Sequence, residues 1–195
     1  MQITLKSSRC VFLSGAAIVL MLVSLLHAQD QPLPKPQIAE TIGEQVPDFT
    51  LKDQDGNEFH LAAHRGERIL LYFYRGYWCP YCMMQMKEFS KHKEDLDKLN
   101  THLVCISVDD KEHARLVWDK VANRQFTFLS DPGAKVIHQY GLLHSGGSLQ
   151  GDDIAIRTTM FIDEQGRQRW RRVSTTVGDI PTMQEILDRI RDSYK

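Results

Sequence analysis

The chain has 195 residues and a formal net charge of −1, from 24 basic and 25 acidic side chains. Hydrophobic residues make up 42% of it and charged residues 25%, an ordinary composition that can supply one well-buried core in a single domain. The balanced charge gives no reason to expect a nucleic-acid partner or a polybasic membrane patch, and four cysteines are too few for a small disulfide-framework protein.

The first 28 residues have the features of a secretory signal peptide. Lys6 and Arg9 form a positive start, residues 11–26 are almost wholly apolar, and Ala28 is a small residue suited to cleavage before Gln29. The apolar stretch is shorter than the roughly 20 residues that a spanning helix needs. We therefore expect a periplasmic or secreted protein without stable membrane insertion, or a membrane-anchored one if the signal is not cleaved.

Residues 29–37 are rich in proline and predict an extended tether, followed by one domain over residues 38–195. Within that domain, residues 46–56 predict a short hairpin because an alternating stretch meets a turn-rich one. Residues 69–74 form a continuous apolar run, as expected of a strand buried on both faces. A helix is predicted from Pro80 to Leu99, because proline suits the first turn and apolar residues then recur at helical spacing.

The later elements follow in a regular order: a buried strand over 103–108, a helix over 111–123, a short extended stretch over 126–129, a turn or helix from 131, a long polar loop after 141, a hairpin over 159–162 and 169–174, and a last helix from about 181. Strands that alternate with helices and end in a hairpin indicate an α/β fold. We expect a central mixed sheet with helices on both faces.

Cys79 and Cys82 are separated by two residues where the first buried strand passes into the first helix. At a helix N-terminus, unpaired N–H groups and the helix dipole favour a thiolate, which is the nucleophile in disulfide exchange and in peroxide attack. A second thiol can then resolve the mixed disulfide or sulfenic acid that forms. The position of the pair therefore predicts a reversible redox centre.

Plainer interpretations of the pair are a structural zinc site or an inert disulfide. Zinc needs four nitrogen or sulfur ligands, and neither a second cysteine pair nor a histidine at ligand spacing accompanies the two cysteines. A disulfide that closes so short a loop stabilises the fold only slightly. Cys105, in the middle of a predicted strand, is most simply a small buried hydrophobic residue. We expect neither a metal nor a cofactor.

Residues 72–82, Tyr-Phe-Tyr-Arg-Gly-Tyr-Trp-Cys-Pro-Tyr-Cys, resemble the active-site strand of the alkyl hydroperoxide reductase/thiol-specific antioxidant (AhpC/TSA) family, the peroxiredoxins. They are most similar to the peroxiredoxin-like branch that carries a Cys-X-X-Cys. Residues 46–51 are similar to the entry strand of that family and residues 158–166 to its late hairpin. The resemblance covers nearly the whole mature chain and implies a thioredoxin-like fold of the peroxiredoxin type.

The resemblance implies two possible roles for the cysteines. Peroxiredoxins present a proline and a threonine seven and three residues before the attacking cysteine, and with Cys82 in that role Arg75 and Cys79 stand there instead. Because the peroxide-binding threonine is absent, we predict a thiol–disulfide oxidoreductase for protein or small-molecule disulfides, with Cys79 attacking, Cys82 resolving and an unidentified thiol as electron donor. The alternative is a thiol-dependent peroxidase with Cys82 as the peroxidatic cysteine. A further possibility, in which the cysteines have no catalytic role, is a non-enzymatic metal- or partner-binding module.

Arg157 stands where the resemblance places the active-site arginine of peroxiredoxins. A guanidinium beside the thiols would favour the thiolate and could donate to a peroxide or sulfenate oxygen. The competing interpretation is a surface arginine paired with Asp152 or Asp153. Arg75 is either a second candidate cation or a simple loop residue, and Trp78 is expected to pack over the disulfide.

Overall fold

A computed structural model describes residues 32–35 and 42–193. The signal peptide predicted for residues 1–28 lies outside these residues, as does most of the predicted tether. Inside the tether, the backbone N–H of Leu33 donates to the carbonyl of Thr175 at 2.8 Å, and Pro32 forms an isolated β-bridge with Thr176. Among the described residues, no helix has the length and apolar character needed to cross a membrane.

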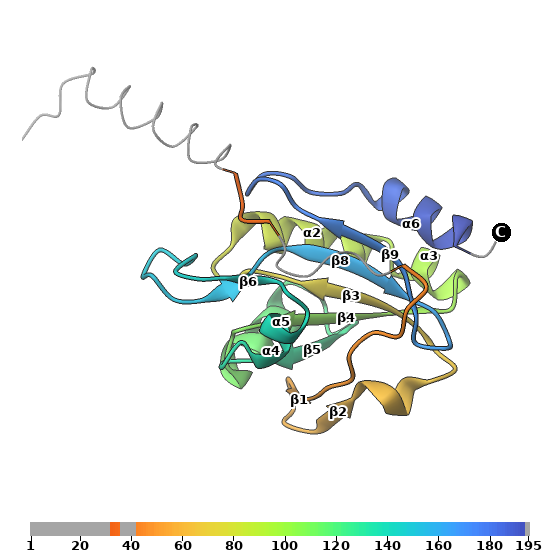
Figure 1. The fold of residues 1–195 in the computed structure, drawn as a ribbon, viewed down its shortest axis with the longest axis horizontal. Helices are drawn as coiled ribbons and strands as arrows, with labels where there is room; N and C mark the ends of the chain where they lie inside the picture. The colour runs from red at the N-terminus through yellow and green to blue at the C-terminus, as the bar shows by residue number, and fades with distance from the viewer. Residues whose placement is uncertain (1–31, 36–41, 194–195) are drawn as a thin grey trace, which may run out of the picture.

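A seven-stranded mixed sheet lies at the centre of the domain, in the order β2-β1-β5-β4-β3-β8-β9 (Figure 1). The strands are β1 (Thr50–Asp53), β2 (Glu58–His60), β3 (Arg68–Phe73), β4 (Thr101–Ser107), β5 (Thr127–Ser130), β8 (Thr158–Ile162) and β9 (Gln168–Val173). Strands β3, β4 and β5 run parallel, and β8 runs antiparallel to β3 with Phe73 opposite Thr158. A separate two-stranded sheet pairs β6 (Leu143–His144) with β7 (Ile154–Ala155).

Helical segments cover both faces of the main sheet. They are η1 (Leu61–His64), α2 (Pro80–Lys91), α3 (Lys93–Lys98), α4 (Lys111–Lys120), α5 (Lys135–Gln139) and α6 (Met183–Asp192). One core cluster joins α2, α3, α4 and α6 to the sheet, whereas a second joins the β1–β2 hairpin, η1, α5 and the β6–β7 pair to it. The predicted α/β fold, with a mixed sheet between helices, is confirmed.

Strand β3 is buried on both faces, as its apolar run predicts. Tyr72 belongs to the cluster under α2, whereas Leu71 and Phe73 belong to the cluster on the opposite face. Alternate side chains of a strand point to opposite faces of the sheet, so each of the two cores takes every second residue. Packing on both faces holds the strand in place, and the chain passes from its carboxyl end to the start of α2.

The single helix predicted for residues 80–99 is wrong in one respect, because it is two helices. His92 has φ −107° and ψ 21°, which ends α2, and its ring nitrogen Nδ1 lies 3.0 Å from the Asp95 carboxylate in the first turn of α3. Phe89 and Leu96 are seven residues apart, about two helical turns, so both remain on the buried side across the break. The apolar spacing therefore gave no sign of it.

Three other features differ from the predictions. The first hairpin begins at Thr50 rather than at residue 46, and the polar loop after Gly141 contains the short β6–β7 pair. The helix predicted over residues 111–123 ends at Lys120. None of these differences moves the junction between β3 and α2.

Candidate active site

The cysteine pair lies at the N-terminus of α2. Cys79 is the N-cap residue, Pro80 occupies the first helical position, and the Cys79 Sγ accepts the backbone N–H of Cys82 at 3.3 Å. Proline fits this position because its missing N–H would have no partner in the helix. The prediction that a helix begins here is confirmed, and the sulfur of Cys79 takes the place of the usual capping oxygen.

Cys79 and Cys82 are joined by a disulfide with a Cα–Cα distance of 5.3 Å. Neither residue has any exposed surface, and both belong to the core cluster that includes Tyr72, Met86 and Phe89. An oxidised, enclosed pair at a helix N-terminus is suited to reversible thiol–disulfide chemistry, because opening it creates a thiolate that the helix stabilises.

Arg157 is buried, so its interpretation as a surface arginine is wrong. Only 1% of the residue is exposed, and Asp152 and Asp153 bind their own loop at Ser148 and Gly146. A buried guanidinium at the start of β8 lies at the same edge of the sheet as the carboxyl end of β3, since these two strands are neighbours.

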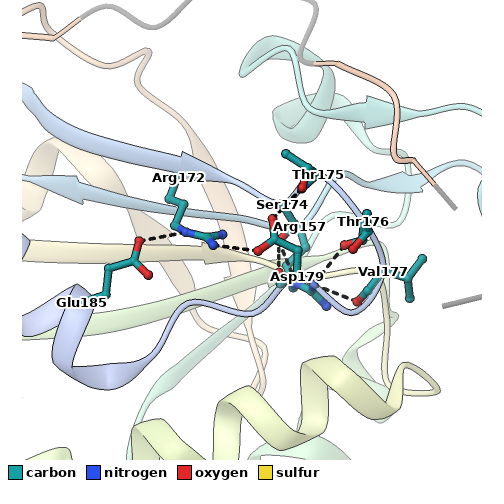
Figure 2. Close-up of polar contacts among 8 residues, drawn as sticks. All are labelled: Arg157, Arg172, Ser174, Thr175, Thr176, Val177, Asp179 and Glu185. Carbon is teal, nitrogen blue, oxygen red and sulfur yellow. Dashed lines mark hydrogen bonds and ion pairs between the residues drawn. The ribbon is translucent and has the colours of Figure 1, made fainter. Parts of the chain in front are cut away.

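A turn of the chain after β9 surrounds the Arg157 guanidinium (Figure 2). Its Nε donates to Ser174 Oγ at 3.0 Å, and its Nη2 donates to the carbonyls of Val177 at 2.9 Å and Asp179 at 2.6 Å. Nη1 is also buried, and among the described residues it has no hydrogen-bond partner. Buried polar groups are nearly always paired, so a lone N–H group points to a ligand or a reacting atom.

The turn is itself held by an ion-pair network. Arg172 donates through Nη2 to Asp179 at 2.7 Å and through Nε to Glu185 at 2.9 Å, as Figure 2 shows. Burial alone would raise the pKa of the Asp179 carboxyl, but its hydrogen bonds to Arg172 and Thr175 outweigh this and lower it. The network fixes the carbonyl groups that receive the Arg157 side chain.

The charge of Arg157 acts on two tyrosines close to the cysteine pair. Tyr72, in the core cluster of the two cysteines, and Tyr81, between them in the sequence, both interact electrostatically with this guanidinium. Burial raises the pKa of Tyr72, and the positive charge of Arg157 opposes that rise. Burial also lowers the pKa of Arg157, but an arginine side chain stays protonated in proteins. A permanent positive charge therefore accompanies the dithiol.

Arg75 and Trp78 form the other side of the junction. Trp78 packs against the core cluster that contains both cysteines, in line with its expected place. The Arg75 Cζ lies 5.2 Å from the centre of the Trp78 ring, a cation–π distance, and Arg75 Nη2 donates to the carbonyl of Gly147 at 2.9 Å. Arg75 is thus half-buried and held rather than a simple loop residue.

One residue that the sequence analysis missed, Asp109, supports this junction from the loop after β4. Its Oδ1 accepts the backbone N–H of Tyr77 at 3.1 Å, and the carbonyl of the preceding Gly76 accepts the N–H of Cys79 at 3.1 Å. Burial raises the pKa of Asp109. A signal was available, because parallel strands β3 and β4 place their carboxyl ends at one edge of the sheet.

Cys105 does not take part in the centre. It is fully buried in β4 and unpaired, and burial raises its pKa well above the usual value, which suppresses the thiolate. Across residues 32–35 and 42–193, no group of three or more His, Cys, Asp or Glu side chains is placed to hold a metal ion.

Comparisons with known proteins agree with this geometry. A sequence model of the AhpC/TSA family matches residues 42–171. A candidate peroxiredoxin of Mycobacterium tuberculosis is 34% identical over 131 residues, which are 65% of this chain and 81% of that relative. Peroxiredoxin Bcp of Escherichia coli is 34% identical over 101 residues, 51% of this chain and 64% of Bcp. The crystal structure of peroxidoxin BcpB from Mycobacterium tuberculosis superposes with a TM-score of 0.68 at 23% identity, covering 79% of this chain and 98% of BcpB, which supports the fold.

Proposed function

Because the chain belongs to the AhpC/TSA family and is peroxiredoxin-like, we propose that it is a thiol-dependent peroxidase that reduces hydroperoxides through Cys79 and Cys82. The names of its relatives favour this activity over the disulfide oxidoreductase that the sequence analysis placed first. The observation that carries the proposal is the enclosed Cys79–Cys82 disulfide beside a buried arginine with one unpaired N–H group.

The reaction needs two thiols and one hydroperoxide in each cycle. The attacking thiolate forms a bond to the terminal peroxide oxygen, the O–O bond breaks, and the alkoxide takes a proton and leaves as an alcohol. The second thiol attacks the resulting sulfenic acid, which releases water and closes the disulfide. Two molecules of a thiol donor then reduce the disulfide and leave as their own disulfide. The dithiol thus passes two electrons to the peroxide.

Arg157 suits a supporting role in that step. Negative charge builds on the leaving oxygen as the O–O bond breaks, and a donor that is already held in place stabilises it without reorganising. Nη1 of Arg157 is the donor that remains after Ser174, Val177 and Asp179 have bound the rest of the side chain. With the chain aligned to the peroxiredoxin motif, Cys82 is the cysteine that attacks the peroxide.

One observation favours a second function, thiol–disulfide exchange with Cys79 as the attacking thiol. The Cys79 sulfur is the N-cap of α2 and accepts the N–H of Cys82. That hydrogen bond would stabilise the Cys79 thiolate once the disulfide is opened. The attacking cysteine therefore differs between the two functions, which makes them separable by experiment.

Single cysteine variants test the proposal. In the reduced Cys79→Ser protein, stoichiometric hydrogen peroxide should produce a sulfenic acid on Cys82 that a dimedone probe traps, and Cys82→Ser should abolish peroxide consumption. Cys105→Ser is the matched control and should consume peroxide like the unaltered protein. Absence of peroxide-driven sulfenylation in Cys79→Ser, with mixed disulfides trapped on Cys79 in Cys82→Ser, would establish disulfide exchange instead.

Export belongs to the proposal as well. Lys6, Arg9 and the apolar residues 11–26 support it, and they predict a mature protein that begins at Gln29. Such a protein would work in an oxidising compartment, where an exported thiol donor must reopen the disulfide in each cycle. Mass spectrometry of fractionated cells tests this, and full-length protein free in the cytosol would contradict it.

A further inference from the structure

Two arginines converge on the edge of the sheet where the cysteine pair lies. Strand β3 ends at Phe73, which faces Thr158 at the start of the antiparallel strand β8. Arg75 follows that end by two residues, and Arg157 precedes the start of β8 by one. The charge of Arg157 acts on Arg75, so the two guanidinium groups are close enough to interact although they are far apart in the sequence.

Arg75 is held by contacts that leave part of its guanidinium unused. Nη2 is bound to the carbonyl of Gly147, and the plane rests near the Trp78 ring. Nε is buried, and within the described part of the chain it has no hydrogen-bond partner, a property it shares with Nη1 of Arg157. Each arginine therefore keeps a desolvated N–H donor beside the redox centre.

Among the described residues, no acidic side chain forms an ion pair with either arginine, although the negative charge of Asp179 acts on Arg157 through space. Burial and then the charge of Arg157 lower the pKa of Arg75, and Arg75 in turn adds to the effect of burial in lowering the pKa of His144. The carboxylates in the region bind other groups. Asp179 pairs with Arg172, and Asp152 and Asp153 bind within their own loop, while Asp109 accepts the N–H of Tyr77 through Oδ1 and its buried Oδ2 has no hydrogen-bond partner among the described residues. Bringing two desolvated cations together without an anion paired to either of them is unfavourable, unless a ligand supplies one.

We propose that Arg75 and Arg157 form a two-cation site that binds a carboxylate on the molecule that reacts with the cysteine pair. Guanidinium groups match carboxylates through parallel N–H donors, and they do so most strongly where water is excluded. The carboxylate can belong to the hydroperoxide or to the reducing thiol. The first case deepens the proposed peroxidase function and rests on it, whereas the second requires only a reducible disulfide.

Three thiols of similar size test the reducing half of the cycle: 3-mercaptopropionate, neutral 2-mercaptoethanol and cationic cysteamine. Reduction of the Cys79–Cys82 disulfide is followed by quenched alkylation and mass spectrometry. In Arg75→Gln the ratio of the 3-mercaptopropionate rate to the 2-mercaptoethanol rate should fall about tenfold relative to the unaltered protein. The cysteamine ratio should rise. Comparing ratios between proteins cancels the intrinsic reactivities of the thiols.

The oxidising half is tested with a fatty-acid hydroperoxide and its methyl ester, which differ only in the carboxylate. A fall in the acid-to-ester rate ratio in Arg75→Gln assigns the site to the oxidant, and a fall confined to the thiol series assigns it to the donor. If neither hydroperoxide oxidises the dithiol, the peroxidase proposal fails. The carboxylate site still stands if the ratio of the 3-mercaptopropionate rate to the 2-mercaptoethanol rate falls in Arg75→Gln. Ratios within twofold of the unaltered protein in both series overturn the site.

Two further variants guard against a trivial result. Arg124→Gln is the matched control, because Arg124 also lies near a tryptophan: its Cζ is 5.6 Å from the centre of the Trp118 ring. Arg124 lies between α4 and β5 and pairs with Asp119. Arg124→Gln should leave both ratios unchanged, so an equal fall there would mean that net charge alone is responsible. Arg75→Lys keeps the charge but loses the planar fork, and should give ratios between those of the unaltered protein and Arg75→Gln.

Discussion

Asp179 holds Arg157 without pairing its charge with it: the carboxylate of Asp179 binds Arg172, while its backbone carbonyl accepts Nη2–H of Arg157 at 2.6 Å (Figure 2). The arginine is thereby positioned by neutral carbonyl groups. The Asp179 carboxylate acts on Arg157 only through space, and its own ion pair with Arg172 stabilises the turn.

Replacing Asp179 by Asn should destabilise the protein in a pH-dependent way. The folded-state pKa of Asp179 is depressed, so its contribution is present above the unfolded pKa of roughly 4 and is lost as the pH falls through the lower folded value. At pH 7 we expect a loss of about 1–2 kcal/mol in the free energy of unfolding. Urea denaturation of the unaltered protein and Asp179→Asn at pH 7 and pH 3 measures this loss. If the difference in the free energy of unfolding is as large at pH 3 as at pH 7, the stabilising role of the Asp179 carboxylate is contradicted.

Replacing Arg157 by Lys should slow peroxide reduction while the fold is kept. Lysine retains a positive charge but cannot reproduce the planar donors to Ser174 and Val177 together with a further N–H for the reacting oxygen. We expect the second-order rate with hydrogen peroxide to fall about 10²-fold, as for loss of one preorganised donor. Arg124→Lys provides the control, and an equal effect there would remove Arg157 from the mechanism.

Gly76→Ala should disturb the junction between β3 and α2. Gly76 has φ +150°, and an added Cβ would lie 2.7 Å from Trp78 Nε1 and 3.2 Å from Asp109 Oδ1. Backbone strain and the close contacts together should lower the free energy of unfolding by about 1–3 kcal/mol and shift the fluorescence of Trp78. Gly66→Ala shares the positive φ, but its Cβ would meet nothing within 4 Å, so the difference between the variants isolates the contacts. Equal stability of the two would argue against a tight junction.

Cys105 should resist alkylation in the native protein. It is fully buried, and its raised pKa leaves little thiolate at neutral pH. After reduction, iodoacetamide should label at least one of Cys79 and Cys82 well before Cys105, and Cys105 should react only on the timescale of unfolding. Peptide mapping at several times provides the measurement. Labelling of Cys105 at a rate like that of the pair would show that β4 opens in the native state.

The redox pair and the overall fold could be predicted because each depends on a local pattern. The apolar run of residues 69–74, the proline after Cys79 and the two-residue spacing to Cys82 leave little freedom for the strand, the helix start and the disulfide. The placement of Arg157 could be named only through a family resemblance. Nothing in the neighbouring residues distinguishes a buried guanidinium from one paired with Asp152.

The remaining parts of the site were hidden because they depend on contacts between distant segments. The turn that receives Arg157 comes 17 to 22 residues later in the chain, and Asp109 reaches Tyr77 across 32 residues. Such contacts follow from strand order and not from periodicity. The break at His92 was hidden for a different reason, since the apolar spacing is the same on both sides of it.

The hydrogen bond between Leu33 and Thr175 gives the leading segment of the chain a mechanical link to the redox centre. Thr175 adjoins Ser174 and Thr176, and the side chain of Ser174 and the carbonyls of the next residues hold the Arg157 guanidinium. A force applied to the chain before residue 32, by a tag, a surface or a membrane anchor, would act on this hydrogen bond before it acted on the strands of the sheet. Immobilising the protein through its C-terminal end would leave the arginine turn without that tension.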